Sequence, residues 1–205
     1  MKTIILDFET SGLNPYHCDI IEIGAKIVET GDTFSSLIRP KSETPISQKI
    51  TEITGITNRE IRKECREKGW NYGGWYDGYA EFYFWLMEHA PDINITIVSH
   101  NGTTFDFLIL KQMMIHLEKG GGDIDAWKHK HITWIDTLLL AKRLMISQEY
   151  FRQSTLCKRL GIPAYNEHRA LDDVLALEKL YTKLVSLSGI MNPYSLKNYI
   201  DLNDS

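Results

Sequence analysis

Two carboxylates stand two residues apart at the end of the first apolar run of the chain. The opening stretch MKTIILDFETSGLNP places Asp7 and Glu9 directly after an Ile-Ile-Leu run. In an extended strand, residues i and i+2 point to the same face, so both carboxylates project from one side. Two like charges this close repel each other, and ionising both is costly without a counter-charge. The spacing therefore predicts a bound metal cation.

Three further residues with suitable chemistry occur later in the chain. Asp106 follows SHNGTTF at the start of an expected helix, and His168 and Asp173 lie in HRALDDVLAL, where the last long helix opens. Carboxylate oxygens without thiolates suit Mg²⁺ or Mn²⁺. The predicted metal ligands are therefore Asp7, Glu9, Asp106 and Asp173.

The pattern of the last helix distinguishes between its two neighbouring aspartates. At about 100° per residue, Asp173 falls within an apolar arc, whereas Asp172 falls on the polar face with Lys179 and Lys183. A carboxylate in an apolar arc is costly unless it is paired or bound to a metal. We therefore predict that Asp173 is functional and that Asp172 is solvated. His168 lies about 140° from Asp173 on an ideal helix, so we expect it in the loop that enters the helix.

The elements that position these residues are strands in the first third of the chain and alternating strands and helices afterwards. Apolar periodicity predicts strands over 2–8, 19–29, 33–40, 94–100 and 131–136. It predicts helices in two pieces over 45–68, with Ser47 and Asn58 as N-caps, and over 79–90, 103–119, 137–146 and 169–187. This order indicates an α/β domain with a mixed five-stranded sheet flanked by helices, over residues 1–187, and a polar C-terminal tail over 188–205.

The composition is that of an ordinary soluble globular protein: 43% of the 205 residues are hydrophobic and 24% are charged. No apolar run approaches the ~20 residues of a membrane span, and the chain reaches Asp7 too soon for a signal peptide, so we expect an intracellular, cytoplasmic protein without membrane contact. The net charge of −4 argues against a protein that coats nucleic acid, but not against an enzyme that acts on it through cations.

The segments DFETSGL, SHNGTTFD and HRALDD resemble the three motifs of the DEDDh family of 3′→5′ exonucleases, in order and similarly spaced. The similarity covers about residues 1–187 and includes PISQKITEITGIT between the first and second motifs. A related subgroup has a tyrosine four residues before its last aspartate, and Arg169 in that position disfavours it. The resemblance implies a ribonuclease H-like exonuclease fold.

By this resemblance, the chain hydrolyses phosphodiester bonds at the 3′ end of single-stranded nucleic acid and releases nucleoside 5′-monophosphates with two Mg²⁺ or Mn²⁺ ions. Asp7 would bridge both ions, Glu9 and Asp173 would complete one site, and Asp106 would bind through water. His168 would act as general base, since an imidazole can accept a proton near neutral pH.

The resemblance also implies a site for the terminal nucleotide, formed by the backbone near Thr10 and the side chains of Leu13 and Phe105. Ordinary packing is an equal alternative for Leu13 and Phe105. DNA is slightly favoured over RNA, and the chain could act alone, as a homodimer or as a proofreading subunit on a polymerase. The aromatic loop over 69–78, with Trp70, Tyr72, Trp75 and Tyr76, either stacks on bases or packs onto the 79–90 helix or a partner subunit.

Overall fold

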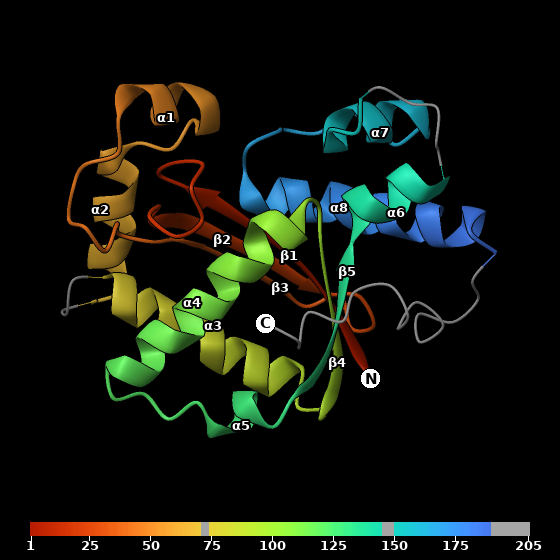
Figure 1. The fold of residues 1–205 in the computed structure, drawn as a ribbon. Helices are drawn as coiled ribbons and strands as arrows, with labels where there is room; N and C mark the ends of the chain where they lie inside the picture. Colours follow the sequence, from red (N-terminus) through yellow and green to blue (C-terminus); the bar gives the residue numbers. More distant parts are fainter. Residues whose placement is uncertain (71–73, 145–149, 190–205) are drawn as a thin grey trace.

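The centre of the computed structural model is a mixed five-stranded sheet in the order β3-β2-β1-β4-β5 (Figure 1). The structure describes residues 1–70, 74–144 and 150–189. β2 pairs antiparallel with both β1 and β3, whereas β4 pairs parallel with both β1 and β5. The strands are β1 (Lys2–Thr10), β2 (Ile20–Ile27), β3 (Thr33–Leu37), β4 (Asn94–Ser99) and β5 (His131–Asp136). The predicted five-stranded mixed sheet is confirmed.

Helices cover both faces of this sheet (Figure 1). One face carries α8 (Ala170–Leu187), with α6 (Thr137–Leu144) and α7 (Gln153–Arg159) packed against it. The other face carries α3 (Trp75–His89) and α4 (Asp106–Lys119). The remaining helical segments are α1 (Gln48–Thr54), α2 (Asn58–Glu67), the 3₁₀ turn η1 (Gly102–Thr104) and α5 (Asp125–Lys128). No helix in the described ranges is long and apolar enough to cross a membrane.

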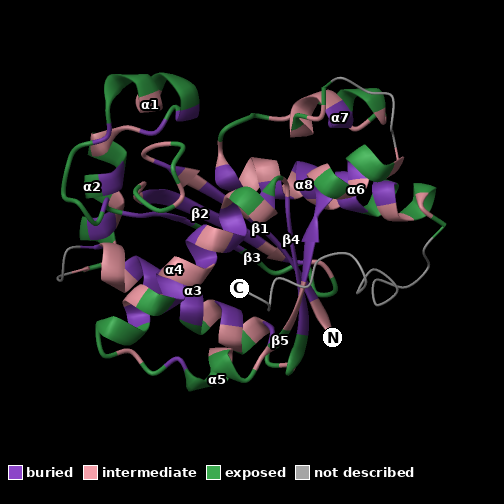
Figure 2. Cartoon of the chain, viewed as in Figure 1, coloured by how far each residue is buried: buried purple, intermediate pink, exposed green. Residues whose placement is uncertain are grey.

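The alternation of β1 decides which face receives the predicted carboxylates. Ile4, Leu6 and Phe8 pack into the core beneath α3 and α4, and Ile5 packs into the core beneath α8. The strand is buried on both faces, as the burial colouring shows (Figure 2). Asp7 and Glu9 continue the row of Ile5 because side chains alternate along a strand. Both carboxylates are therefore directed to the side of the sheet that α8 covers.

The N-terminal turn of α8 approaches the backbone of β2 very closely at Gly24. A Cβ added at Gly24 would lie 2.4 Å from the carbonyl carbon of Ala170, so only glycine fits there without a shift of the helix. Further along the same face, Lys26 Nζ lies 2.6 Å from Glu178 Oε2. β2 therefore holds α8 near its first turn and again about two turns later.

α3 begins at Trp75, so the prediction of a loop over residues 69–78 was wrong in its second half. Its glycines suggested a turn, but Gly78 lies inside the helix, where an added Cβ would lie 2.4 Å from Ile38 Cδ1. The glycine therefore permits a close contact between the helix and the core instead of ending the helix.

Three residues of the predicted aromatic loop pack against the core beneath α3 and α4: Trp70, Trp75 and Tyr76. The packing interpretation is confirmed for these three. Tyr72 lies outside the described residues, as does the predicted tail beyond residue 189.

The helices α1 and α2 have well-defined N-terminal caps. Ser47 caps α1 as predicted, but Thr57, not Asn58, caps α2, through a reciprocal capping box with Glu60. Asn58 instead bonds both backbone groups of Ile46 with its side-chain amide. The prediction failed because an asparagine can satisfy backbone groups elsewhere in the chain.

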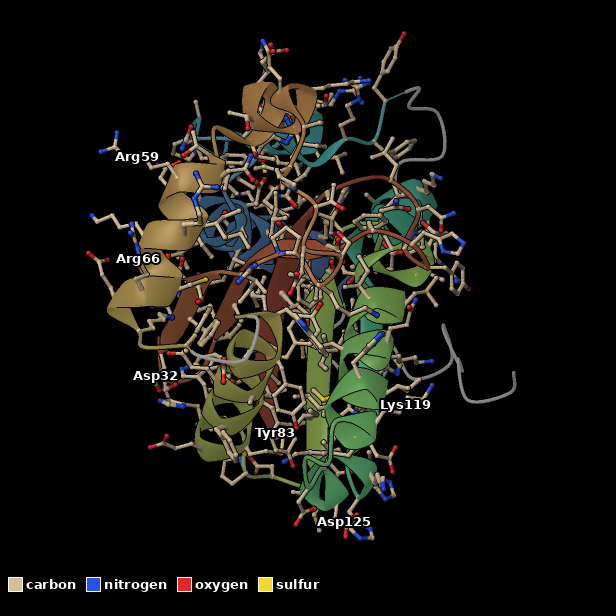
Figure 3. The ribbon with its side chains drawn as sticks, turned by 90° about the vertical axis from the view of Figure 1, so that its left-hand side faces the viewer. Asp32, Arg59, Arg66, Tyr83, Lys119 and Asp125 are labelled. Atoms are coloured by element: carbon tan, nitrogen blue, oxygen red, sulfur yellow. The ribbon has the colours of Figure 1, made fainter. Side chains whose placement is uncertain are left out.

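α2 has one buried and one solvent-exposed face. Ile61 and Cys65 belong to a small separate core, while Arg59 and Arg66 point away from the helix into solvent (Figure 3). The short helices α5 and α7 were not predicted. α7 proves important because it borders the candidate site.

Candidate active site

Three predicted metal ligands come together between β1 and the first turn of α8. Ligand oxygens of Asp7, Glu9 and Asp173 all lie within 4.8 Å of one another. The fourth, Asp106, begins α4 and is 3% exposed, and its Oδ1 accepts a hydrogen bond from the backbone N–H of Phe8 (3.2 Å). All four carboxylates line one open cavity of about 200 Å³. The structure thus brings the four together, although they come from segments far apart in the sequence.

Burial and mutual repulsion make it difficult to ionise this carboxylate cluster. Burial, followed by repulsion from Asp106 and Asp173, raises the pKa of Asp7 well above its usual range. Burial and then repulsion from Asp173 raise the pKa of Glu9 to about 8. Burial also raises the pKa of Asp106 to about 7 and that of Asp173 to about 6. The cluster is therefore short of positive charge, and its hard oxygen donors fit a divalent cation such as Mg²⁺ or Mn²⁺.

His168 lies in the turn just before α8, as predicted, and lines the same cavity. Its backbone has a φ of 67°, in the left-handed region that is uncommon for residues other than glycine. The backbone N–H of His168 donates to Asp173 Oδ2 (2.8 Å), which ties the turn to the cluster. The imidazole is exposed, whereas the backbone that carries it is fixed.

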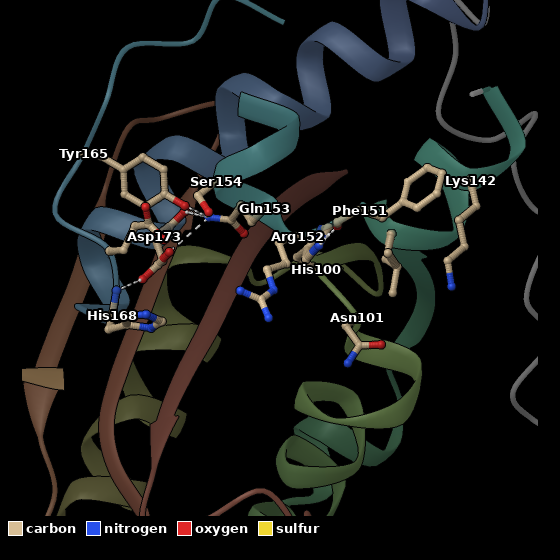
Figure 4. A pocket seen from close by; sticks show the side chains of 12 residues that line it. His100, Asn101, Lys142, Phe151, Arg152, Gln153, Ser154, Tyr165, His168 and Asp173 are labelled. Atoms are coloured by element: carbon tan, nitrogen blue, oxygen red, sulfur yellow. Dashed lines mark hydrogen bonds between the residues drawn. The ribbon is translucent and has the colours of Figure 1, made fainter. Parts of the chain in front are cut away.

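The structure distinguishes between the two aspartates at the start of α8. Asp173 contributes to the carboxylate cluster, and its second oxygen is also engaged: Gln153 Nε2 lies 3.2 Å from Asp173 Oδ1 (Figure 4). Asp172 is half-buried and, within the described ranges, belongs to no such cluster. The placement of Asp173 agrees with the apolar arc of the helix.

The turn that leads into Asp106 is organised by a buried carboxylate at the end of β5. Asp136 accepts hydrogen bonds from the backbone N–H groups of Asn101 (3.0 Å) and Thr103 (3.1 Å). His100 is anchored beside it, with Nδ1 2.9 Å from Thr137 Oγ1 and burial lowering the pKa of the imidazole. His100 and Asn101 thus shape the turn, while Asp136 is a supporting residue that sequence reasoning missed.

The residues predicted to hold a terminal nucleotide differ in their surroundings. Leu13 is 94% exposed, so the alternative that it packs in the core is wrong. Phe105 packs partly against the core and also lines the cavity with the four carboxylates. Thr10 is buried, and its hydroxyl donates to the carbonyl of Gly12 (2.7 Å), which shapes the loop that presents Leu13.

Two more residues next to the cluster were missed by sequence reasoning. Gln153, at the start of α7, donates to both the carboxylate and the backbone carbonyl (2.9 Å) of Asp173. A single glutamine in an unpredicted helix gives no sequence signal. Glu22 on β2 contacts Arg169 and Ala170, and it did leave a signal: an acidic residue between isoleucines in a strand buried on both faces.

Comparison with known proteins gives consistent matches. Residues 4–181 match the family model described as Exonuclease. The chain is 34% identical over 205 residues to the PolC-type DNA polymerase III of Thermotoga maritima, a match that covers 98% of this chain and 13% of the polymerase. The match to the corresponding Bacillus subtilis polymerase is 29% identical over 188 residues and covers 89% of this chain and 11% of that protein.

Solved structures share the fold. A structure of exonuclease I superposes with a TM-score of 0.71 at 21% identity, over 97% of this chain and 42% of that chain. The zinc-bound complex of E. coli exonuclease I with single-stranded DNA gives a TM-score of 0.69 at 22% identity, with the same coverage. The ribonuclease H-like exonuclease fold is therefore confirmed. Because the family model spans most of the sequence, the chain belongs to the exonuclease family that its three motifs indicate.

Proposed function

We propose that this chain is a metal-dependent 3′→5′ exonuclease that releases nucleoside 5′-monophosphates from single-stranded nucleic acid. The observation that carries the proposal is the cluster of Asp7, Glu9 and Asp173, whose ligand oxygens lie within 4.8 Å of one another. Asp106 and His168 line the same cavity. Burial and then repulsion between the carboxylates raise the pKa values of Asp7 and Glu9, which is the opposite of what an ion pair with a basic side chain would do. The cavity is also open, so that a substrate and a water can reach the cluster.

Two divalent ions held by the four carboxylates would activate a water and stabilise the attacking and leaving oxygens of an in-line displacement. The protein's own residues hold this arrangement. The N–H of His168 and the amide of Gln153 each bond one oxygen of Asp173 and fix its orientation. The imidazole of His168 accepts the proton of the attacking water, while Phe105 and the exposed Leu13 contact the terminal nucleotide.

A second cavity of about 600 Å³ provides a path for the rest of the strand. It shares His168, Gln153 and Asp173 with the carboxylate cavity and extends between α6, α7 and the turn before α8 (Figure 4). Lys142 and Arg152 line it and offer positive charge for phosphates. Its two aromatic side chains, Phe151 and Tyr165, are suited to stack on bases.

Removing charge from this second cavity is expected to weaken substrate binding without slowing the chemical step. For Arg152→Ala and Lys142→Ala, we expect KM on single-stranded DNA to rise roughly 10-fold, kcat to stay the same, and the salt slope of binding to fall by about 1 for each lost phosphate contact. Steady-state kinetics and binding from 50 to 200 mM salt measure both effects. Lys119→Ala, at the opposite end of α4 from Asp106, is the matched control, and an equal effect there would contradict the proposed path.

The central experiment compares matched 5′-labelled single-stranded DNA and RNA, digested with Mg²⁺ or with EDTA. We expect a Mg²⁺-dependent ladder from the 3′ end that Asp173→Asn abolishes and Asp172→Asn leaves intact. The control is close because the two residues are neighbours and only Asp173 joins the cluster. No ladder on either substrate, or equal losses in both variants, would refute the proposed activity.

DNA is the proposed substrate in preference to RNA, and proofreading beside a polymerase is the proposed setting. The support comes from the relatives, which are PolC-type DNA polymerases III, and from the solved exonuclease I complex with single-stranded DNA. The chain spans about an eighth of the length of those polymerases. Co-purification with a large polymerase partner would favour the proofreading setting, and full activity of the chain alone would favour a free-standing enzyme. Faster digestion of the matched RNA would favour an RNA-processing exoribonuclease instead.

A further inference from the structure

Glu22 is a buried carboxylate that accepts hydrogen bonds from three N–H groups. Two belong to Arg169, the residue before α8, and one to Ala170, the first residue of α8. Glu22 is 1% exposed and is the third residue of β2. Arg169 approaches it with two nitrogens, Nη2 at 2.9 Å from Oε1 and Nε at 3.2 Å from Oε2. The backbone N–H of Ala170 donates to Oε2 at 3.0 Å. A bidentate arginine and a helix N-terminal N–H together satisfy a charge that would otherwise be costly to bury.

The residues that Glu22 holds lie between the two functional residues of this segment. His168 immediately precedes Arg169, and its N–H donates to Asp173 Oδ2 (2.8 Å). The N–H of Asp173 in turn donates to the carbonyl of Arg169 (2.9 Å). The close contact of Ala170 with Gly24 leaves this turn little room to move sideways. A continuous set of contacts therefore leads from Glu22 to both His168 and Asp173.

We propose that Glu22 and Arg169 form a positioning pair that sets His168 and Asp173 at the correct distance from Asp7 and Glu9. This inference rests on the proposed function for its catalytic consequence. Glu22 is not one of the residues lining the carboxylate cavity. It reaches the turn through the guanidinium of Arg169 and the backbone N–H of Ala170, and its charge also adds to the repulsion on Asp7 and Glu9. His168 has a left-handed backbone conformation that glycine adopts without strain. The ion pair holds the histidine in this conformation.

A second ion pair between the same two elements provides a matched control. Lys26 on β2 and Glu178 on α8 lie 2.6 Å apart and are 18% and 20% exposed. They also join the helix to the strand, but they lie beyond the turn that contains His168 and Asp173. If Glu22 merely fastens α8 to the sheet, loss of either ion pair has the same effect. If Glu22 positions the catalytic turn, only its own loss slows the reaction.

The kinetic test compares Glu22→Gln, Arg169→Lys and Glu178→Gln in the full chain with Mg²⁺ and single-stranded DNA. For Glu22→Gln we expect kcat to fall about 10- to 100-fold with KM within about twofold, as is typical when a residue supporting a ligand is lost. Arg169→Lys keeps the charge but loses the planar fork, so it should show a smaller loss of kcat. Equal losses of kcat in Glu22→Gln and Glu178→Gln, compared at temperatures where both variants are fully folded, would overturn the proposal.

Amide hydrogen exchange in the metal-free protein tests the positioning without any substrate. We expect the N–H groups of His168 and Ala170 to exchange at least about 10-fold faster in Glu22→Gln and at the wild-type rate in Glu178→Gln. Unchanged protection in Glu22→Gln would refute the positioning role, whatever the kinetics show. If the wild-type protein hydrolyses no nucleic acid, the proposed function fails, while the exchange data still decide whether Glu22 fixes this turn.

Discussion

Asp7→Asn is expected to lower the rate of Mg²⁺-dependent hydrolysis by about 10³-fold or more while making the metal-free protein more stable. The substitution keeps the shape of the side chain but removes a charge that the bound ions need. Metal ions contribute several kcal/mol of transition-state stabilisation, and a loss of about 4 kcal/mol corresponds to about 10³-fold in rate. Single-turnover digestion of labelled single-stranded DNA at saturating Mg²⁺ measures the loss.

The gain in stability follows from the raised pKa values of the cluster. As the pH rises, a carboxylate ionises first in the unfolded chain, because its pKa is higher in the folded protein. The folded state therefore loses stability as the pH rises, and for Glu9 this occurs between its usual pKa of 4.5 and about 8. Asp7→Asn relieves part of the repulsion, so its advantage over the wild type should be larger at pH 8 than at pH 5.

Thermal unfolding in EDTA checks this expectation. At pH 8 we expect the Tm of Asp7→Asn to exceed that of the wild type by at least ~2–4 °C, which corresponds to ~1 kcal/mol for a chain of this size. Mn²⁺ should raise the Tm of the wild type and reverse the order. Asp172→Asn, outside the cluster, should have the Tm of the wild type in EDTA and should gain as much from Mn²⁺ as the wild type does. A less stable Asp7→Asn at pH 8 would mean that the carboxylates do not repel one another in the folded protein.

Removing the imidazole of His168 is expected to lower kcat by about 10²- to 10⁴-fold, the usual contribution of a general base. Metal binding should be unchanged, because the bond from this residue to Asp173 uses the backbone N–H and survives the substitution. Kinetics at saturating substrate and calorimetric titration with Mn²⁺ separate the two effects.

The φ of 67° at His168 requires two variants, because alanine is strained in the left-handed region whereas asparagine tolerates it. His168→Asn should therefore lose activity as His168→Ala does, but without the loss of stability. His131→Ala, at the exposed start of β5, removes a histidine away from the cluster and should leave kcat unchanged. Near-normal kcat in both His168 variants would exclude this residue as the base.

The parts of this fold that followed from the sequence are those set by local periodicity. Alternation along β1 put Asp7 and Glu9 on one face, and the apolar arc of α8 separated Asp173 from Asp172. Each of these inferences needed only the geometry of a single element. The expected fold followed from the strand order and the resemblance to known exonucleases.

The parts that did not follow from the sequence depend on contacts between distant segments. Gln153 reaches Asp173 only because α7 packs against α8, and Glu22 reaches Ala170 only because Gly24 allows the helix to approach β2. Gly78 looked like a loop residue because its partner, Ile38, is distant in the sequence. Predictions from the sequence use a residue's neighbours along the chain, whereas the roles of Gln153, Glu22 and Gly78 depend on their neighbours in space.

The candidate site draws on β1, on the start of α4 and on the start of α8, and this has a consequence for folding. No partly folded chain that lacks a docked α8 can present the full set of ligands, since Asp173 and His168 come from that element. Pairing such distant segments is a slow step in folding. The repulsion among the carboxylates opposes the final docking until cations neutralise it. Nuclease activity would therefore arise only with the completed fold, and a nascent chain would be harmless to the nucleic acid around it.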